Sequence, residues 1–388
     1  MKVMRHLSVP NQHVEHVLDL MREQNLLAPG MRVFAAENGN SRLIPIDSGA
    51  ALNLPSELSD YPITEHEGRT DERIDTDWWT HLTNLLGDEI VEAGGEAWPS
   101  SHEFFADMMI VRLEEEVAQY SSEIATAKLL SHPHIRLVLS DAGVLGELRI
   151  RNLSPIGARI DDQIVVEHIP QNVTSTRVLV KESGRSILCD PTRAYFSTKL
   201  QSERLETLGL AKELRSLLGR PLRVCDPFCG VGPALATLLG ESDLVGGLLA
   251  TDLNPDAVEL LFDNLRRWDR KEYPVEPIPV TNLHHDRIAG LADATELQNN
   301  PELVGRWDLL LVNLPHRTIE FLPSLIPLLD RTETSMIRGR VIVAESEIED
   351  ANEAIRKTLP PRLQDTPEPT LKIKRDYSST LRLCSFEA

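Results

Sequence analysis

The stretch that most constrains the fold is Cys225–Asp252, which reads CDPFCGVGPALATLLGESDLVGGLLATD. A short apolar run, Leu222–Cys225, precedes a turn that carries Gly230 and Gly232, and a helix-like segment follows the turn. A second apolar run then ends at Asp252. Strand, glycine turn, helix, strand and acid in this order predict a nucleotide-shaped pocket at the carboxyl ends of parallel strands.

The polar positions of this turn indicate which kind of ligand it holds. Glycines let the backbone approach a ligand where a Cβ would collide, and the carboxylate of Asp252 can accept hydrogen bonds from both hydroxyls of a ribose. The turn reads GVGPAL, so it lacks the third glycine of the dinucleotide fingerprint. Asp226 stands just before it, where a carboxylate repels a diphosphate and favours a cationic amino-acid ligand. S-adenosylmethionine fits, because it joins an adenosine to a sulfonium and an ammonium group without a phosphate; the alternative is a strand–helix turn without ligand.

Two later segments extend this pattern. Asn254-Pro255-Asp256 predicts an N-cap, a proline at the first helical position and an acid in the first turn. Asp293 follows another strand-like region, where an acid can contact the adenine amino group. An N-cap role fits Asp293 equally well.

The acceptor side of the site is predicted by Trp307–Val312, a buried-strand pattern that ends in Asn313-Leu314-Pro315-His316. Asparagine and proline at such a strand exit suit the amine or amide edge of a flat base. His316 stands where the version of this motif for exocyclic amines carries Tyr or Phe, which favours a ring nitrogen as the acceptor. Asn313 could also be a simple turn residue.

Four segments together resemble the tRNA guanine N1-methyltransferases of the archaeal and eukaryotic type. They are Tyr195–Arg204 (YFSTKLQSER), Asp226–Pro233, Asp252–Val258, and Asn313–Pro315 with Glu320–Leu322 downstream. Three more segments resemble the middle domain of that family: Phe104–Glu116, Tyr120–Ala127 with His132-Pro133, and Gly146–Arg151. The first fifty residues resemble the small N-terminal domain of the archaeal three-domain form.

The resemblance implies methylation of N1 of guanine 37 in tRNA, beside the anticodon. Guanine N1 carries a proton that a base must remove, and Glu203 matches the base of the family. Negative charge then develops on O6, where a cation stabilises it; Arg151 is the preferred candidate and Arg149 the second. Asn313 would orient the guanine edge. Without a ligand, Glu203 and its neighbour Arg204 could instead be an exposed helical pair.

The residues expected around S-adenosylmethionine come from these same segments. They are Tyr195, Asp226, Phe228, Gly230, Gly232, Asp252, Leu253, Asn254, Asp293 and Asn313.

Length and pattern predict several domains in the 388-residue chain. We expect an α/β protein with a Rossmann-like class I methyltransferase domain over 181–388. A small N-terminal α/β domain for tRNA recognition (1–50), an acidic linker (51–76) and a middle α+β domain (77–180) precede it.

Composition restricts the partners and the compartment. The net charge of −20 opposes binding to RNA phosphates, although 31 arginines against nine lysines allow a local basic patch. We expect contacts with the anticodon loop and the tRNA body. No apolar run is long enough to span a membrane and no secretory signal is visible, so we expect a cytoplasmic monomer. The four scattered cysteines predict buried, reduced thiols, with a zinc pair at Cys225 and Cys229 as the alternative.

Two other functions remain open at this point. One is transfer of the aminocarboxypropyl group of the same cofactor in wybutosine synthesis; Glu203 and the Asn313–Pro315 turn argue against it, because that related class typically lacks both. The other is a tRNA-binding protein without catalysis, which the presence of Glu203 and Asp252 disfavours.

Overall fold

The computed structural model describes residues 3–24, 26–28, 30–36, 39–50, 54–69, 77–146, 148, 150–161, 163–361 and 366–388. The chain divides into two compact units, which are described separately. The first comprises Met1–Trp98, Glu114–Val138 and Ile156–His168, and the second comprises Pro99–Leu113, Leu139–Pro155 and Ile169–Ala388. Among the described residues, no helix is both long and apolar enough to cross a membrane.

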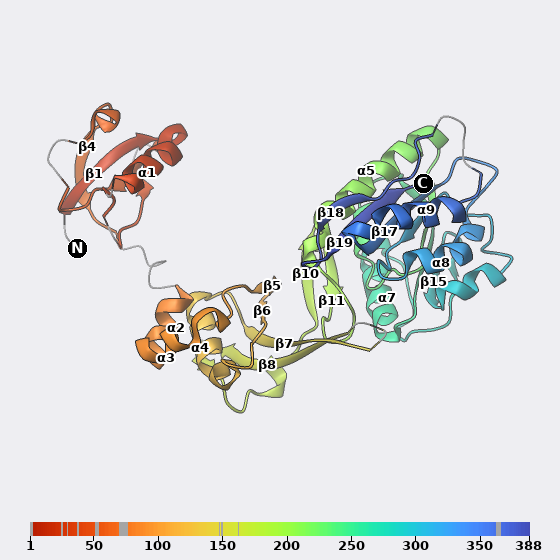
Figure 1. Ribbon diagram of the computed structural model, residues 1–388, viewed down its shortest axis with the longest axis horizontal. Helices are drawn as coiled ribbons and strands as arrows, with labels where there is room; N and C mark the ends of the chain where they lie inside the picture. The colour runs from red at the N-terminus through yellow and green to blue at the C-terminus, as the bar shows by residue number, and fades with distance from the viewer. Residues whose placement is uncertain are drawn as a thin grey trace. The chain divides into compact units, whose positions relative to one another are not determined.

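The N-terminal part of the first unit is a four-stranded sheet with one helix (Figure 1). The strand order is β2-β3-β1-β4, and β1 pairs antiparallel with both β3 and β4. Val17 and Met21 of the helix are fully buried against the sheet, as their helical spacing predicts. The elements are β1 (Val3–Pro10), α1 (Val14–Glu23), β2 (Phe34–Ala35), β3 (Ser41–Pro45) and β4 (Ile63–Glu67).

The acidic segment 51–76 is not the linker that the sequence predicts throughout its length. β4 lies inside it and pairs with β1, with Glu67 opposite Val3 and Ile63 opposite Leu7. Its sequence, ITEHE, is too polar to indicate a strand, but charged side chains suit a strand at the edge of a sheet. The linker prediction is therefore wrong for β4, and residues 51–53 and 70–76 lie outside the described residues.

The middle of the chain contains a five-stranded sheet with the order β5-β6-β7-β8-β9. The helix α4 begins at Ser121, and β8 begins at Ile150, because Gly146 has a φ of 62° and belongs to a turn. The elements are α2 (Trp78–Leu86), α3 (Asp88–Gly94), β5 (Glu103–Phe105), β6 (Met108–Val111), α4 (Ser121–Ser131), β7 (Leu137–Leu145), β8 (Ile150–Ile160) and β9 (Gln163–Val165).

The C-terminal part of the second unit is an eight-stranded mixed sheet with helices on both faces (Figure 1). Its order is β14-β15-β13-β12-β16-β17-β19-β18. β12, β13, β15, β16 and β17 pair in parallel, whereas the β14–β15, β17–β19 and β18–β19 pairs are antiparallel. The chain order reverses between β12 and β16, which is the position where open α/β sheets bind ligands. The strands are β12 (Leu222–Asp226), β13 (Val245–Asp252), β14 (Thr281–His284), β15 (Arg287–Leu291), β16 (Leu309–Val312), β17 (Met336–Ala344), β18 (Lys372–Asp376) and β19 (Leu381–Glu387).

The sheet separates two hydrophobic cores. Val224 packs in one core and its neighbour Cys225 in the other, because successive strand residues point to opposite faces. One core contains residues of α5 (Gln201–Leu218), α6 (Pro233–Leu239) and α7 (Pro255–Asp269); the other contains residues of α8 (Thr318–Leu325) and α9 (Ile348–Thr358). A hairpin of β10 (Val178–Glu182) and β11 (Arg185–Cys189) precedes α5. The prediction of an α/β fold for this part of the chain is confirmed.

Candidate functional site

The glycine turn joins β12 to α6 and has the geometry that the sequence predicts. Gly230 and Gly232 have φ angles of 55° and 84°, in the left-handed region that favours glycine. A Cβ on Gly232 would lie 2.9 Å from Leu261 Cδ1, so a larger residue would also collide there. Beside Gly230 a Cβ would meet nothing closer than 3.7 Å, which leaves room for a ligand near the backbone.

Asp252 is fixed at the carboxyl end of β13. Its carboxylate accepts hydrogen bonds from the backbone N–H of Gly230 at 2.8 Å and of Asn254 at 2.9 Å. Burial raises the pKa of Asp252. The next residue, Leu253, is apolar and 57% exposed, and its contact with the cofactor stays a prediction.

Two other residues of the predicted cofactor site, Asn254 and Asp293, cap helical segments. Asn254 caps α7 by accepting from Asp256 N–H at 3.0 Å, which confirms the predicted helix start. Asp293 is exposed and accepts from Thr295 N–H at 2.9 Å. Asp293 therefore caps a short 3₁₀ turn, and a contact with adenine stays a prediction.

Asp226 is the most perturbed acid of the turn. It is 2% exposed, and its carboxylate accepts one long hydrogen bond of 3.4 Å from Phe228 N–H. Burial raises the pKa of Asp226 to about 7, and the negative charge of Asp252 adds to the rise. A bound cation would replace the missing stabilisation, so this carboxyl group fits the sulfonium and ammonium of the expected cofactor.

Glu203 lies in the first turn of α5 and is buried. Its Oε2 lies 2.9 Å from Nε of Arg340, and Nη1 of Arg340 donates to Oδ1 of Asn313 at 2.9 Å. Arg340 therefore connects Glu203, the predicted general base, with Asn313, whose amide is predicted to orient the guanine. Burial lowers the pKa of Arg340, and the negative charges of Glu203 and Asp226 oppose this shift. Because Asp226 stands just before the glycine turn, Arg340 lies near that turn.

Arg340 was missed by the sequence reasoning, although β17 carries a signal for it. The strand reads MIRGRVIVA, and two arginines at alternate positions in an apolar strand must both be paired on one face. Arg338 pairs with Glu206 at 3.0 Å and also with Glu387. Two acids of α5, one helical turn apart, thus meet two arginines of β17.

Arg204 and Glu182 form a separate buried pair, with side-chain exposures of 4% and 3% and a distance of 2.7 Å. Arg204 also donates to the backbone oxygen of Ser197 at 2.8 Å. The alternative of an exposed Glu203–Arg204 pair is therefore wrong. Each residue of the ER motif has a buried partner of its own, and Arg204 holds the strand-to-helix segment before α5.

Arg151 is already paired with two carboxylates. It donates to Glu103 at 2.9 Å and to Asp141 at 2.7 and 3.1 Å, and their effect raises the pKa of Arg151. None of these hydrogen bonds joins Arg151 to Glu203 or to Asn313. Its role at O6 stays a prediction, and Arg149 lies outside the described residues.

Aromatic side chains border the site. Tyr195 is 47% exposed, and its backbone oxygen faces Gly230. Phe228 packs edge to face on Phe321, with ring centres 5.5 Å apart. His316 packs in the same way against Tyr377 at 5.4 Å, so an aromatic ring far along the chain stands beside the Asn313–Pro315 turn.

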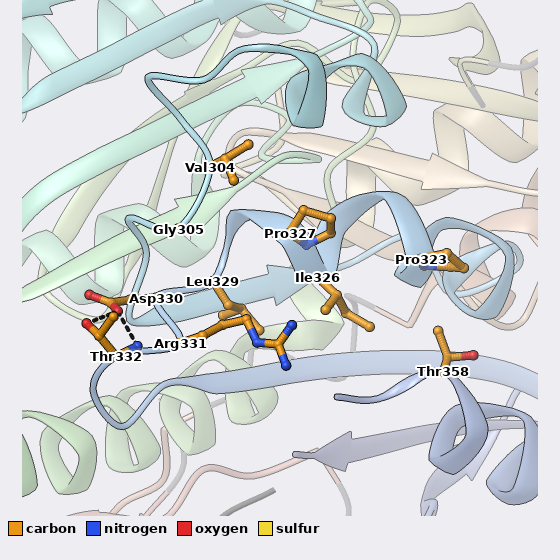
Figure 2. A pocket seen from close by; sticks show the side chains of 10 residues that line it. All are labelled: Val304, Gly305, Pro323, Ile326, Pro327, Leu329, Asp330, Arg331, Thr332 and Thr358. Atoms are coloured by element: carbon orange, nitrogen blue, oxygen red, sulfur yellow. Dashed lines mark hydrogen bonds between the residues drawn. The ribbon is translucent and has the colours of Figure 1, made fainter. Parts of the chain in front are cut away.

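A cavity of about 730 Å³ lies at the strand ends opposite to the glycine turn (Figure 2). Its walls include Val304 and Gly305, which precede β16, and Asp330 and Thr332, which precede β17. Asn313, in contrast, follows β16. The cavity therefore lies at the amino ends of these strands, away from the edge where such sheets bind ligands.

The cysteines are free buried thiols, including Cys225 and Cys229 beside the turn. In the part of the chain that the structure describes, the one group of acids, cysteines or histidines close enough to share a metal ion is Asp308, Asp330 and Glu333. Arg220 and Arg223 already pair with that group.

Comparison with known proteins relates this geometry to a family. No family model matches the chain. The tRNA (guanine(37)-N(1))-methyltransferase Trm5b of Pyrococcus abyssi is 28% identical over 229 residues, which cover 59% of this chain and 56% of the relative. The chain is homologous to archaeal Trm5b. A tRNA (guanine(37)-N(1))-methyltransferase of Paramecium tetraurelia is 36% identical over 87 residues, or 22% of this chain and 20% of the relative. The match thus spans about half of the length of Trm5b and less of the other relative.

Solved structures of the Trm5 group share the fold. Trm5b from Pyrococcus abyssi superposes with a TM-score of 0.61 at 20% identity, and covers 99% of this chain and 98% of its own. A complex of aTrm5 with tRNALeu gives 0.60 at 18% identity, with 98% of both chains covered. The likeness therefore extends to the segments before the eight-stranded sheet.

Proposed function

We propose that this chain transfers the methyl group of S-adenosylmethionine to N1 of guanine 37 in tRNA. The observation that carries the proposal is the group of Glu203, Arg340 and Asn313 beside a turn built on Asp226 and Asp252. A buried carboxylate next to a cofactor turn suits a reaction that must remove a proton before the methyl transfer. The homology to Trm5b supports the choice of substrate.

The residues of the chain divide the chemistry between them. S-adenosylmethionine, when bound, supplies an electrophilic methyl group on sulfur. Glu203 takes the proton from guanine N1, and the electron pair left on N1 forms the new bond to carbon as the bond from sulfur to carbon breaks. Asn313 orients the guanine edge, and Arg151 supplies positive charge toward O6.

The cofactor fits the residues of the turn. Asp252 would accept from the ribose hydroxyls, and the space beside Gly230 admits a ligand close to the backbone. Tyr195, Phe228, Leu253 and Asn313 would line the pocket, with Gly232, Asn254 and Asp293 shaping its edges. Asp226 would face the cationic end of the ligand, because burial raises its pKa and the positive charge of Arg340 offsets the rise only in part.

We further propose that the N-terminal sheet reads the tRNA body while the flipped guanine enters the catalytic domain. The complex of aTrm5 with tRNALeu is a similar protein bound to such a substrate, and this supports the proposal.

Labelled cofactor tests the reaction. The protein is mixed with tRNA that carries guanine or adenine at position 37, and with S-adenosylmethionine labelled either in the methyl group or in the carboxypropyl carbons. We expect methyl label on the guanine tRNA alone. Carboxypropyl label on tRNA would support aminocarboxypropyl transfer, and absence of both labels would support binding without catalysis.

The Glu203→Gln variant tests the assignment of the base. Glutamine keeps the shape of the side chain and cannot take the proton, so we expect single-turnover methylation to fall by about 10²–10⁴-fold. Cofactor affinity should change little, as measured by calorimetry. A rate within a few-fold of the wild type would show that Glu203 is not the base.

A further inference from the structure

The proposed reaction gives Arg340 no role of its own. It lies on β17, is 7% exposed, and its guanidinium contacts Glu203 and Asn313 at 2.9 Å each. These two side chains come from α5 and from the turn after β16. Arg340 is thus the one group that makes both contacts in the described part of the chain.

The contact with Asn313 fixes the polarity of an amide. A guanidinium has only hydrogen-bond donors, so Asn313 must present its oxygen to Arg340. The amide nitrogen then points away from Arg340 and is the atom that can donate to a ligand. The contact with Glu203 also holds its carboxylate, an acceptor on both oxygens, in a set place.

An amide donor beside a carboxylate acceptor matches the hydrogen-bonding groups of guanine and opposes those of adenine. The Watson–Crick edge of guanine offers an acceptor at O6 and donors at N1 and N2. Adenine offers a donor at N6 and a lone pair at N1. Its N6 amino group would face the amide N–H, donor against donor, and its N1 lone pair would face the carboxylate, acceptor against acceptor. A site that pairs polar groups rejects such a mismatch strongly, because its buried groups lose their partners.

We propose that Arg340 is a positioning residue that makes the site selective for guanine, by locking the Asn313 amide and holding the Glu203 carboxylate. This inference rests on the proposed function. Without the guanidinium, the amide can turn and present its oxygen, which would suit the adenine amino group. The donor toward O6 would then be lost in part of the molecules.

Arg338 provides a matched control on the same strand. It lies two residues away on the same face, is 4% exposed, and also joins β17 to α5 through Glu206. Its ion pairs are with Glu206 and Glu387, and not with Glu203 or Asn313. Arg338→Met therefore removes a buried ion pair between the same two elements and leaves the amide locked.

The experiment measures single-turnover methylation of tRNA with guanine or adenine at position 37 by the wild type, Arg340→Met, Arg340→Lys and Arg338→Met. We expect Arg340→Met to lower kcat on guanine by about 10²-fold, the loss typical of one misplaced donor. Its preference for guanine over adenine should fall at least about 10-fold, while the KM for the cofactor stays within about 2-fold. Arg338→Met should keep the preference, even where its thermal stability is lower.

Arg340→Lys separates the charge of Arg340 from its geometry. The charged groups around Arg340 are Glu203 and Arg204 of α5, Asp226 of β12 and Arg338 of β17. Lysine keeps the positive charge beside Glu203 but not the planar double contact. The guanine preference should therefore fall in Arg340→Lys while the KM for the cofactor stays unchanged, which a merely structural role would not produce.

Three results are distinguishable. Failure of the wild type to methylate guanine 37 would overturn the proposed function itself. Methylation by the wild type with an unchanged guanine preference in Arg340→Met would overturn the role of Arg340 alone. If Arg340→Met does not fold, Arg340→Lys decides the matter by the same preference ratio.

Discussion

Asp226 gives the sharpest test of the cofactor turn, because burial raises its pKa from 3.8 to about 7. A shift of this size corresponds to ~4 kcal/mol of differential free energy between the two protonation states. Replacement by asparagine keeps the shape and the acceptor for Phe228 N–H, and removes the ionisation. We therefore expect Asp226→Asn to stabilise the free protein at neutral pH.

The sign of the effect follows from proton binding. The pKa of the folded state lies above that of the unfolded state, so between about pH 4 and pH 7 the folded state holds a proton that the unfolded state has lost. The free energy of unfolding of the wild type therefore falls as the pH rises through this window, and is constant above it. The advantage of Asp226→Asn should be absent near pH 4 and reach at most ~4 kcal/mol at pH 8.

Calorimetric unfolding at pH 5 and pH 8 measures this difference. The transition that shifts on addition of S-adenosylmethionine identifies the eight-stranded sheet. At ~4 kcal/mol, the upper limit expected for its shift at pH 8 in Asp226→Asn is roughly 8–16 °C. Asp330→Asn is a control of opposite sign, because hydrogen bonds from Thr332 and the charge of Arg223 lower the pKa of Asp330. That variant should lose stability at pH 8.

Cofactor affinity should change in the opposite direction to stability. If the ionised form of Asp226 binds the cationic ligand, a pKa of about 7 makes binding by the wild type ~10-fold weaker at pH 6 than at pH 8. Asp226→Asn should bind weakly at both values. A stability gain that is equal at pH 5 and pH 8, or an unchanged affinity, would refute the reasoning.

Three other predictions concern the frame of the site and its partner. Arg204→Met leaves Glu182 buried without its partner, so we expect a loss of about 3–5 kcal/mol in urea unfolding, which Glu182→Met in the same chain should largely restore. Gly232→Ala forces a φ of 84° on a residue with a Cβ and crowds Leu261, so it should cost about 1–3 kcal/mol and weaken cofactor binding in calorimetry. Binding of tRNA, followed by filter retention, should weaken as salt rises; a flat response would contradict docking through phosphates.

The sequence predicts the strand, the glycine turn and the capped helix well because these features are local. Strand, turn, helix and acid lie within Leu222–Asp256, and their spacing determines which atoms meet. Gly230 N–H reaches Asp252 in the structure as the pattern requires. The same holds for the cap of α7 at Asn254, where the signal is two residues long.

The sequence fails where a partner comes from a distant part of the chain. Arg340 is 137 positions from Glu203 and lies on a strand whose place between β16 and β19 no local pattern reveals. β4 is missed for a similar reason, since only its pairing with β1 makes ITEHE a strand. In both cases the deciding interaction is non-local, and the local composition argues for something else.

The charges of the site also bear on the acidic composition of the chain. Glu203, Asp226 and Asp252 are three acids, and Arg340 is a cation that interacts with two of them. Burial raises the pKa of Asp226 to about 7, so near neutral pH this acid carries its charge in only part of the molecules. A cationic cofactor would restore the balance, so its binding should release protons near pH 7, and the number released should fall in Asp226→Asn. These three acids account for only a small part of the net charge of −20, so the proposed binding of tRNA phosphates would need arginines gathered elsewhere on the surface.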